Sequence, residues 1–84
     1  MKTIRLSAHA KEQSLERGTT EGEVREAVER GVAEPAKGGR VIYRINLPYH
    51  ALWQGKFYAI KQVAPVVAEA QNELVVVTVY TFYF

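Results

Sequence analysis

The strongest constraint on the fold is the apolar run at residues 73–84, which consists largely of Val, Thr, Tyr and Phe. These residue types favour a pleated, packed strand, and the run is too apolar on both faces for a bare edge of a sheet. We therefore expect a central strand. Alternation predicts Val75, Val77 and Val79 on one face, taken as the core face, and Leu74, Val76, Thr78, Tyr80 and Phe82 on the other.

The length of the chain limits it to a single domain, residues 1–84. A domain of this size buries a modest core, so self-association would stabilise it and we expect a homodimer. The chain has no Cys, which excludes disulfides and thiolate chemistry, and no apolar run approaches the roughly 18 residues of a membrane span. Its first residues lack the apolar segment of a secretory signal, so we expect a cytoplasmic protein without membrane contacts.

Two helices are expected near the start of the chain. Ser7 is a suitable N-cap for a helix that ends near Arg17, with Gly18 directly after it. Residues 20–23, Thr-Glu-Gly-Glu, form the pattern of a capping box, and the helix that follows is expected to end at Gly31 in a Schellman motif. Apolar residues at helical spacing predict the buried stripe of this second helix, which consists of Val24, Ala27, Val28 and Gly31.

Alternation and turn residues predict an antiparallel meander for the rest of the chain. Residues 33–39, rich in Gly and Pro, are expected to form a loop. Strands are then expected at residues 40–47, which Pro48 ends, and at residues 57–64, which follow a turn at residues 53–56. A bulge or a break is expected at Pro65. With the terminal strand, these elements predict an α+β fold in which two N-terminal helices pack on a three- or four-stranded antiparallel sheet.

Basic residues are concentrated in the second part of the chain. Residues 37–84 hold five Lys or Arg against two Glu, a net charge of +3, whereas residues 1–36 hold six against seven. A positive half that is also rich in Tyr and Phe suits a polyanion whose bases stack on aromatic rings. The other explanation is a set of solvated charges at strand edges.

Several short motifs occur in a fixed order: His9-Ala10, Arg17-Gly18, residues 20–24, Gly31, Tyr43-Arg44 and residues 77–80. Over about residues 6–80 they resemble the domain-of-unknown-function family 4258, which is similar to the barnase, EndoU, colicin and RelE-like group of small metal-independent ribonucleases. The resemblance implies a RelE- or barnase-like helical pair on a curved antiparallel sheet whose open face meets RNA. Because that group includes toxins of toxin–antitoxin systems, it also implies an antitoxin-like partner protein. The family usually carries Arg where this chain has Gln13, so one phosphate-binding group of the family is replaced here.

The chemistry of metal-independent RNA cleavage indicates which side chains to expect in such a site. It needs a base for the 2′-hydroxyl, an acid for the leaving oxygen and donors that hold the phosphorane charge. His9 is the candidate base or acid because imidazole titrates near neutral pH. Arg17 lies two turns along the same helical stripe and supplies a fork of donors, and Thr78 is the hydroxyl expected to position the phosphate. The candidates for substrate binding are Arg44, Lys61 and Tyr80.

Each of these candidates also has a structural explanation. His9 would be an ordinary helix-face histidine, and Arg17 a cation favoured by the helix C-terminus. Arg44 and Lys61 would be exposed strand charges, and Thr78 suits a strand without any ligand. The aromatic side chains after Thr78 would cover the helices or form a dimer contact.

No metal and no cofactor are expected, since two His without Cys or Asp give too few zinc ligands and the chain has no glycine-rich phosphate loop. The predicted function is a toxin-like, metal-independent endoribonuclease that cleaves RNA by attack of the 2′-hydroxyl. The alternative is a non-catalytic RNA-binding or protein-interaction module. A cleft that joins His9, Arg17 and Thr78 around one phosphate-sized volume would favour the enzyme.

Overall fold

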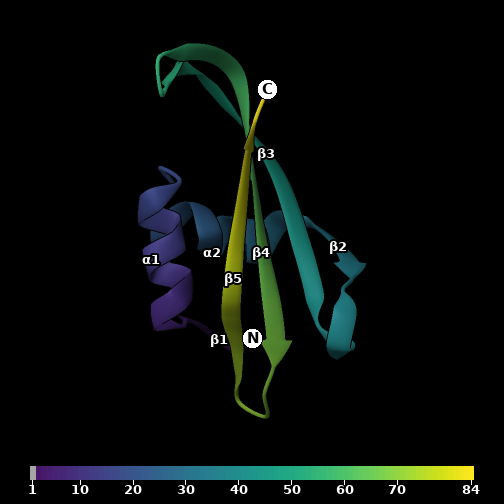
Figure 1. Cartoon of the computed structure of the whole chain (residues 1–84). Helices are drawn as coiled ribbons and strands as arrows, with labels where there is room; N and C mark the ends of the chain where they lie inside the picture. The colour runs from purple at the N-terminus through teal and green to yellow at the C-terminus, as the bar shows by residue number, and fades with distance from the viewer. Residues whose placement is uncertain (1) are drawn as a thin grey trace.

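The computed structural model describes residues 2–84, which form two helices and a five-stranded sheet (Figure 1). In chain order the elements are β1 (Thr3–Leu6), α1 (Ala8–Glu16), α2 (Glu21–Arg30), β2 (Val32–Pro35), the 3₁₀ turn η1 (Lys37–Gly39), β3 (Val41–Trp53), β4 (Lys56–Glu69) and β5 (Glu73–Tyr83). The strand order is β1-β5-β4-β3-β2, with β1 parallel to β5 and the other pairs antiparallel. The α+β class and the two helices are confirmed, whereas the expected sheet of three or four antiparallel strands is corrected to a mixed sheet of five.

Two short strands that were not among the expected sheet strands lie at the edges of the sheet. β1 has four residues, of which only Ile4 and Leu6 are buried, and it pairs with the first part of β5. β2 is exposed at all four positions and pairs with β3, and its last three residues lie in the segment expected to be a loop. Strands this short show too few alternations to be recognised, and their pairing partner decides their conformation.

The hydrophobic core lies between the helices and one face of the sheet. α2 crosses behind the strands in Figure 1 and buries Val24, Ala27 and Val28, which confirms its predicted stripe. α1 stands beside β5 and adds Ala10. The strands contribute Ile4, Leu6, Val63, Val67, Val76 and Val79. The opposite face of the sheet, which we call the open face, has neither α1 nor α2 packed across it (Figure 1).

A β-bulge in β5 changes which of its residues face the core. The register of β5 against β4 skips Val77, and this extra residue reverses the alternation of the strand. Val76 and Val79 are therefore both fully buried, while Val75 is only half-buried. The core position expected for Val79 is confirmed. The faces expected for residues 74–77 are wrong, because a strand pattern does not reveal a bulge.

The predicted helix starts are confirmed, but the predicted end of α2 is not. The Ser7 hydroxyl accepts a hydrogen bond from the backbone of α1, and Thr20 and Glu23 form the expected capping box. Gly31 has a φ of −75°, so it does not adopt the left-handed conformation of a Schellman motif. A Cβ at Gly31 would lie 2.8 Å from the carbonyl oxygen of Arg44. The glycine is therefore needed because α2 approaches β3 closely at this point.

β3 and β4 extend beyond the rest of the sheet as a hairpin arm that arches over the top of the molecule in Figure 1. Pro48 does not end β3 as expected; the register shifts between Pro48 and Ala51, and the strand continues to Trp53. The predicted turn at residues 53–56 is present, and its two central residues have the positive φ typical of a tight hairpin. Trp53 lies so close to Gly18 that a Cβ there would be 2.5 Å from its ring. The arm thus contacts the link between the two helices.

Pro65 lies within β4, where the sequence predicted a bulge or a break. β4 passes through this buried residue without interruption, and the extra residue of the nearby irregularity is Val77 of β5. The predicted irregularity therefore belongs to the neighbouring strand.

Candidate nucleic-acid interface

Three of the predicted site residues line one pocket on the open face. The pocket has a volume of about 380 Å³, and its walls include Arg44 of β3 together with Thr78 and Tyr80 of β5. Lys37 and Arg40, from the turn between β2 and β3, add two further cations that were not among the predicted site residues. We call this hollow the basic pocket. The only sign of Lys37 and Arg40 in the sequence is the positive excess of residues 37–84.

The charge of the basic pocket suits an anion. Its lining holds Lys37, Arg40 and Arg44 against one acid, Glu34, which leaves a net charge of +2. Arginine supplies a planar fork of donors that matches phosphate, and a threonine hydroxyl adds a short donor beside it. The pocket is therefore chemically suited to hold a phosphate group.

Arg44 is held in place from two sides. Its Nε donates to Glu34 Oε1 at 3.0 Å, and its Nη1 donates to Gln62 Oε1 at 3.1 Å. Gln62 is fixed in turn by donating Nε2 to Asn46 Oδ1 at 2.9 Å. Within residues 2–84, Arg44 Nη2 donates to no partner, so a positioned side chain keeps one terminal nitrogen for a ligand.

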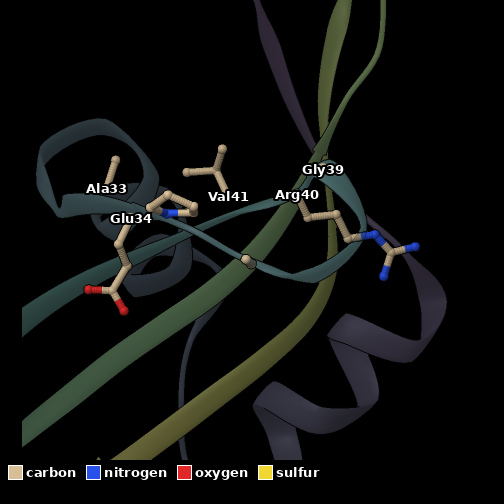
Figure 2. Close-up of a pocket in the computed structure, with 7 residues that line it drawn as sticks. Ala33, Glu34, Gly39, Arg40 and Val41 are labelled. Atoms are coloured by element: carbon tan, nitrogen blue, oxygen red, sulfur yellow. The ribbon is translucent and has the colours of Figure 1, made fainter.

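A second hollow, of about 420 Å³, lies next to the basic pocket and shares Glu34 and Arg40 with it (Figure 2). In Figure 2 the Glu34 and Arg40 side chains extend away from one another, while Ala33 and Val41 lie on the far side of the ribbon from the Glu34 carboxylate. Arg40 is the one cation in the lining of this hollow. With one cation and one carboxylate it has no net charge, so it is less suited to phosphate than the basic pocket.

Gln13 and Arg17 bind the backbone of β5 at the part of its edge that does not pair with β1. β1 pairs with β5 only as far as Leu6 and Val76. Beyond that point the Val79 N–H donates to Gln13 Oε1 at 2.9 Å, and Arg17 Nη1 donates to the Val79 carbonyl at 2.6 Å. Two side chains of the α1 segment thus satisfy the backbone groups that a neighbouring strand would otherwise satisfy. Gln13, which stands where the family resemblance expected Arg, acts here as a hydrogen-bond acceptor.

Replacement of Gln13 by Arg is expected to lower the free energy of unfolding by about 1–2 kcal/mol, because no acceptor would remain for the Val79 N–H. Gln13→Glu keeps an acceptor oxygen and places it four residues before Arg17, so we expect wild-type stability or slightly more. Urea unfolding measures both variants, and hydrogen exchange at the Val79 amide reports the bond directly. An equal loss in Gln13→Glu and Gln13→Arg would contradict this role.

Arg17 also reaches the open face. Its guanidinium carbon lies 5.7 Å from the centroid of the Tyr80 ring, within the range of a cation–π contact. Burial, followed by the proximity of Tyr49 and of the Glu23 carboxylate, raises the pKa of Tyr83 to about 12. The Tyr83 hydroxyl donates to the Arg17 carbonyl, which holds the backbone of Arg17 as well as its side chain. Arg17 therefore supports Tyr80 at the border of the basic pocket.

His9 lies apart from the basic pocket. It is exposed on α1, one turn before Gln13, and it does not line the pocket that contains Thr78. No hydrogen bond joins its imidazole to another residue within 2–84. The structure therefore brings together Arg44, Thr78 and Tyr80, places Arg17 over Tyr80, and leaves His9 outside this group.

Lys61 lies on the opposite side of the sheet from the basic pocket. It is 5% exposed, and its Nζ donates to the Gly18 carbonyl at 2.9 Å and to Glu23 Oε1 at 2.8 Å. The ring of Tyr49 covers it at 5.4 Å. This buried ion pair beneath the arm differs from the substrate-binding role expected from the sequence, and Lys61 is not part of the candidate interface.

Within residues 2–84, no three His, Asp or Glu side chains gather closely enough to hold a metal ion. Over the same residues, neither helix has the length and apolar character needed to cross a membrane. No protein-family model, no curated protein and no solved structure matches this chain.

Proposed function

We propose that the protein binds RNA across the open face of its sheet, with the phosphate backbone in the basic pocket. The observation that carries this proposal is the convergence of Lys37, Arg40 and Arg44 with Thr78 and Tyr80 in one hollow. Cations supply most of the affinity of proteins for nucleic acid backbones, and an aromatic ring beside them gives a base a surface on which to stack.

The resemblance of the sequence motifs supports RNA as the polyanion. It led us to expect an RNA-facing sheet in a fold like that of the RelE- and barnase-like ribonucleases, and we propose the same relationship for this chain. Two helices packed on one face of a largely antiparallel sheet, with the other face open, support that proposal. The homodimer, the antitoxin-like partner and the cytoplasmic location stay predictions.

Removal of Arg44 and Arg40 should weaken RNA binding by about tenfold or more and reduce its salt dependence. For a single strand, the slope of log K against log salt should fall by about 0.7 for each phosphate-binding cation removed. Fluorescence anisotropy of a labelled 12-nucleotide RNA at several salt concentrations measures both quantities for Arg44→Ala, Arg40→Ala and the double variant.

Arg30→Ala is the matched control, because it removes an equal charge from an exposed position at the end of α2, outside the basic pocket. The proposal predicts that this control keeps the wild-type slope. If Arg30→Ala and Arg44→Ala reduce affinity and slope equally, binding comes from overall charge and the basic pocket is not the site. If the wild-type protein binds no RNA at low salt, the proposed function is wrong.

A second candidate function is metal-independent cleavage with His9 as base or acid. The observation that favours it is the shared helical stripe of His9, Gln13 and Arg17, of which the latter two reach β5 at Val79. In that reaction the 2′-oxygen would attack the adjacent phosphorus and lose its proton to a base, and the 5′-oxygen would leave with a proton, which gives a cyclic phosphate.

Incubation of the RNA with protein in EDTA, followed by a denaturing gel, distinguishes the two functions. Cleavage that is lost in His9→Ala and kept in His50→Ala would establish the catalytic function. Binding without cleavage leaves the RNA-binding function alone.

A further inference from the structure

A row of three aromatic side chains continues from the basic pocket along the end of β5. Tyr80, Phe82 and Phe84 alternate onto the same face and are 43%, 45% and 56% exposed. The residues opposite them on β4 are Ala64, Gln62 and Ile60, none of them aromatic. Phe84 is tied into the sheet by two backbone hydrogen bonds with Ile60, at 2.8 and 3.0 Å. We call these three side chains the aromatic row.

The spacing of the aromatic row is unsuited to a double helix. The Tyr80 and Phe82 rings are inclined by only 17° to one another, and their centroids lie 6.4 Å apart. Stacked bases in a duplex are separated by about 3.4 Å and show only their edges to a protein. Rings at nearly twice that spacing match successive bases only where the strand is extended and its bases are unstacked.

The row and the basic pocket form one continuous track. Tyr80 belongs to both, because it lines the pocket and is the first ring of the row. Arg17 holds this shared ring through its cation–π contact. The cations lie at one end of the track and the aromatic rings at the other. A nucleic acid strand can match both ends, because its phosphates carry negative charge and its bases present flat apolar surfaces. A purely apolar partner would leave the cations of the pocket without counter-charges.

We infer that the ligand of the open face is single-stranded RNA, with a phosphate in the basic pocket and unpaired bases stacked on Tyr80, Phe82 and Phe84. This inference rests on the proposed RNA binding and adds to it the class of RNA and the residues that select it. Stacking accepts any base, so selectivity should be for unpaired over paired RNA and not for one sequence.

The test compares a labelled 12-nucleotide RNA with the same RNA annealed to its complement, by anisotropy at one salt concentration. The single strand should bind the wild-type protein at least about tenfold more tightly than the duplex. Phe82→Ala and Phe84→Ala should each weaken single-strand binding by about tenfold and leave duplex binding unchanged. Phe82→Leu, which keeps an apolar side chain and removes the ring, should behave like Phe82→Ala, and Phe82→Tyr should restore binding.

Phe57→Ala is the matched control, since it removes an equally exposed Phe from the arm, outside the aromatic row. Melting curves of all variants check that the fold is retained. If the duplex binds as tightly as the single strand, the inference is wrong and the proposed function stands. The same conclusion holds if the Phe82 and Phe84 variants bind the single strand as tightly as Phe57→Ala does while Arg44→Ala binds it more weakly. Sedimentation that shows wild-type dimers and monomeric Phe82→Ala, with RNA affinity unchanged, would instead assign the row to contact between two copies. Absence of RNA binding by the wild-type protein would overturn both.

Discussion

Glu23→Ala is expected to lower the free energy of unfolding by about 3 kcal/mol. Its carboxylate accepts two hydrogen bonds through one oxygen, from the Thr20 N–H at 3.0 Å and from Lys61 Nζ at 2.8 Å. Loss of the capping bond alone costs about 1 kcal/mol. The remaining cost arises because Lys61 would stay buried as a cation with only the Gly18 carbonyl as its partner.

Three further variants separate these two contributions in urea unfolding. Glu23→Gln keeps a capping oxygen and removes the charge. It should therefore lower the free energy of unfolding by less than Glu23→Ala does. Adding Lys61→Met to Glu23→Gln should recover part of the loss, because an apolar side chain in place of a buried cation needs no counter-ion. Glu26→Ala removes a partly exposed carboxylate from the same helix and should cost less than about 1 kcal/mol. A loss in Glu23→Ala no larger than that in Glu26→Ala would contradict the role assigned to the buried pair.

Gly31→Ala is the second variant with a large expected effect. It should lower the free energy of unfolding by about 2–3 kcal/mol. The added Cβ would lie 2.4 Å from the Ala27 carbonyl oxygen and 2.8 Å from that of Arg44. Both neighbours are backbone atoms, so they cannot rotate away, and α2 would have to move from β3. Since Arg44 lines the basic pocket, the proposed RNA binding should weaken together with stability.

Gly22→Ala provides the matched comparison on the same helix. Its Cβ would meet nothing nearer than Thr20 Oγ1 at 3.8 Å, and Ala is favoured over Gly in a helix by about 1 kcal/mol. Thermal unfolding of the two variants should therefore show changes of opposite sign. Equal melting temperatures would mean that the close approach at Gly31 is not a constraint.

Features of the fold that depend on neighbouring residues could be predicted from the sequence. The capping box of Thr20 and Glu23 and the buried stripe of α2 each need only a few consecutive residues, and both are present. The turn at residues 53–56 follows in the same way from its own residues. Gly31 does not form the predicted Schellman end of α2, because this glycine is required by the nearby backbone of Arg44 instead of by a left-handed conformation.

The site could be predicted in part, residue by residue. Alternation correctly predicted that Thr78 and Tyr80 face the side of the sheet opposite to Val79. Arg44 likewise alternates with apolar residues in its own strand. Their convergence with Lys37 and Arg40 depends on the register of three strands and on the course of the turn after β2. Lys61 looked equally suitable in the sequence, yet its register with Tyr83 places it on the helix side of the sheet.

The local elements follow from the amino-acid sequence alone: where the helices start, which segments are apolar enough to be buried strands, and which charges lie in the second part of the chain. Three features depend on contacts between distant segments and are seen only in the folded chain. β1 joins β5 in parallel, the pairing of β5 with β4 skips Val77, and Gln13 and Arg17 bind the backbone at Val79. The physical reason is the range of the interactions. Caps and turns are satisfied by hydrogen bonds between near neighbours, whereas the face of a strand and the partner of its edge depend on hydrogen bonds and buried contacts between residues far apart in the sequence.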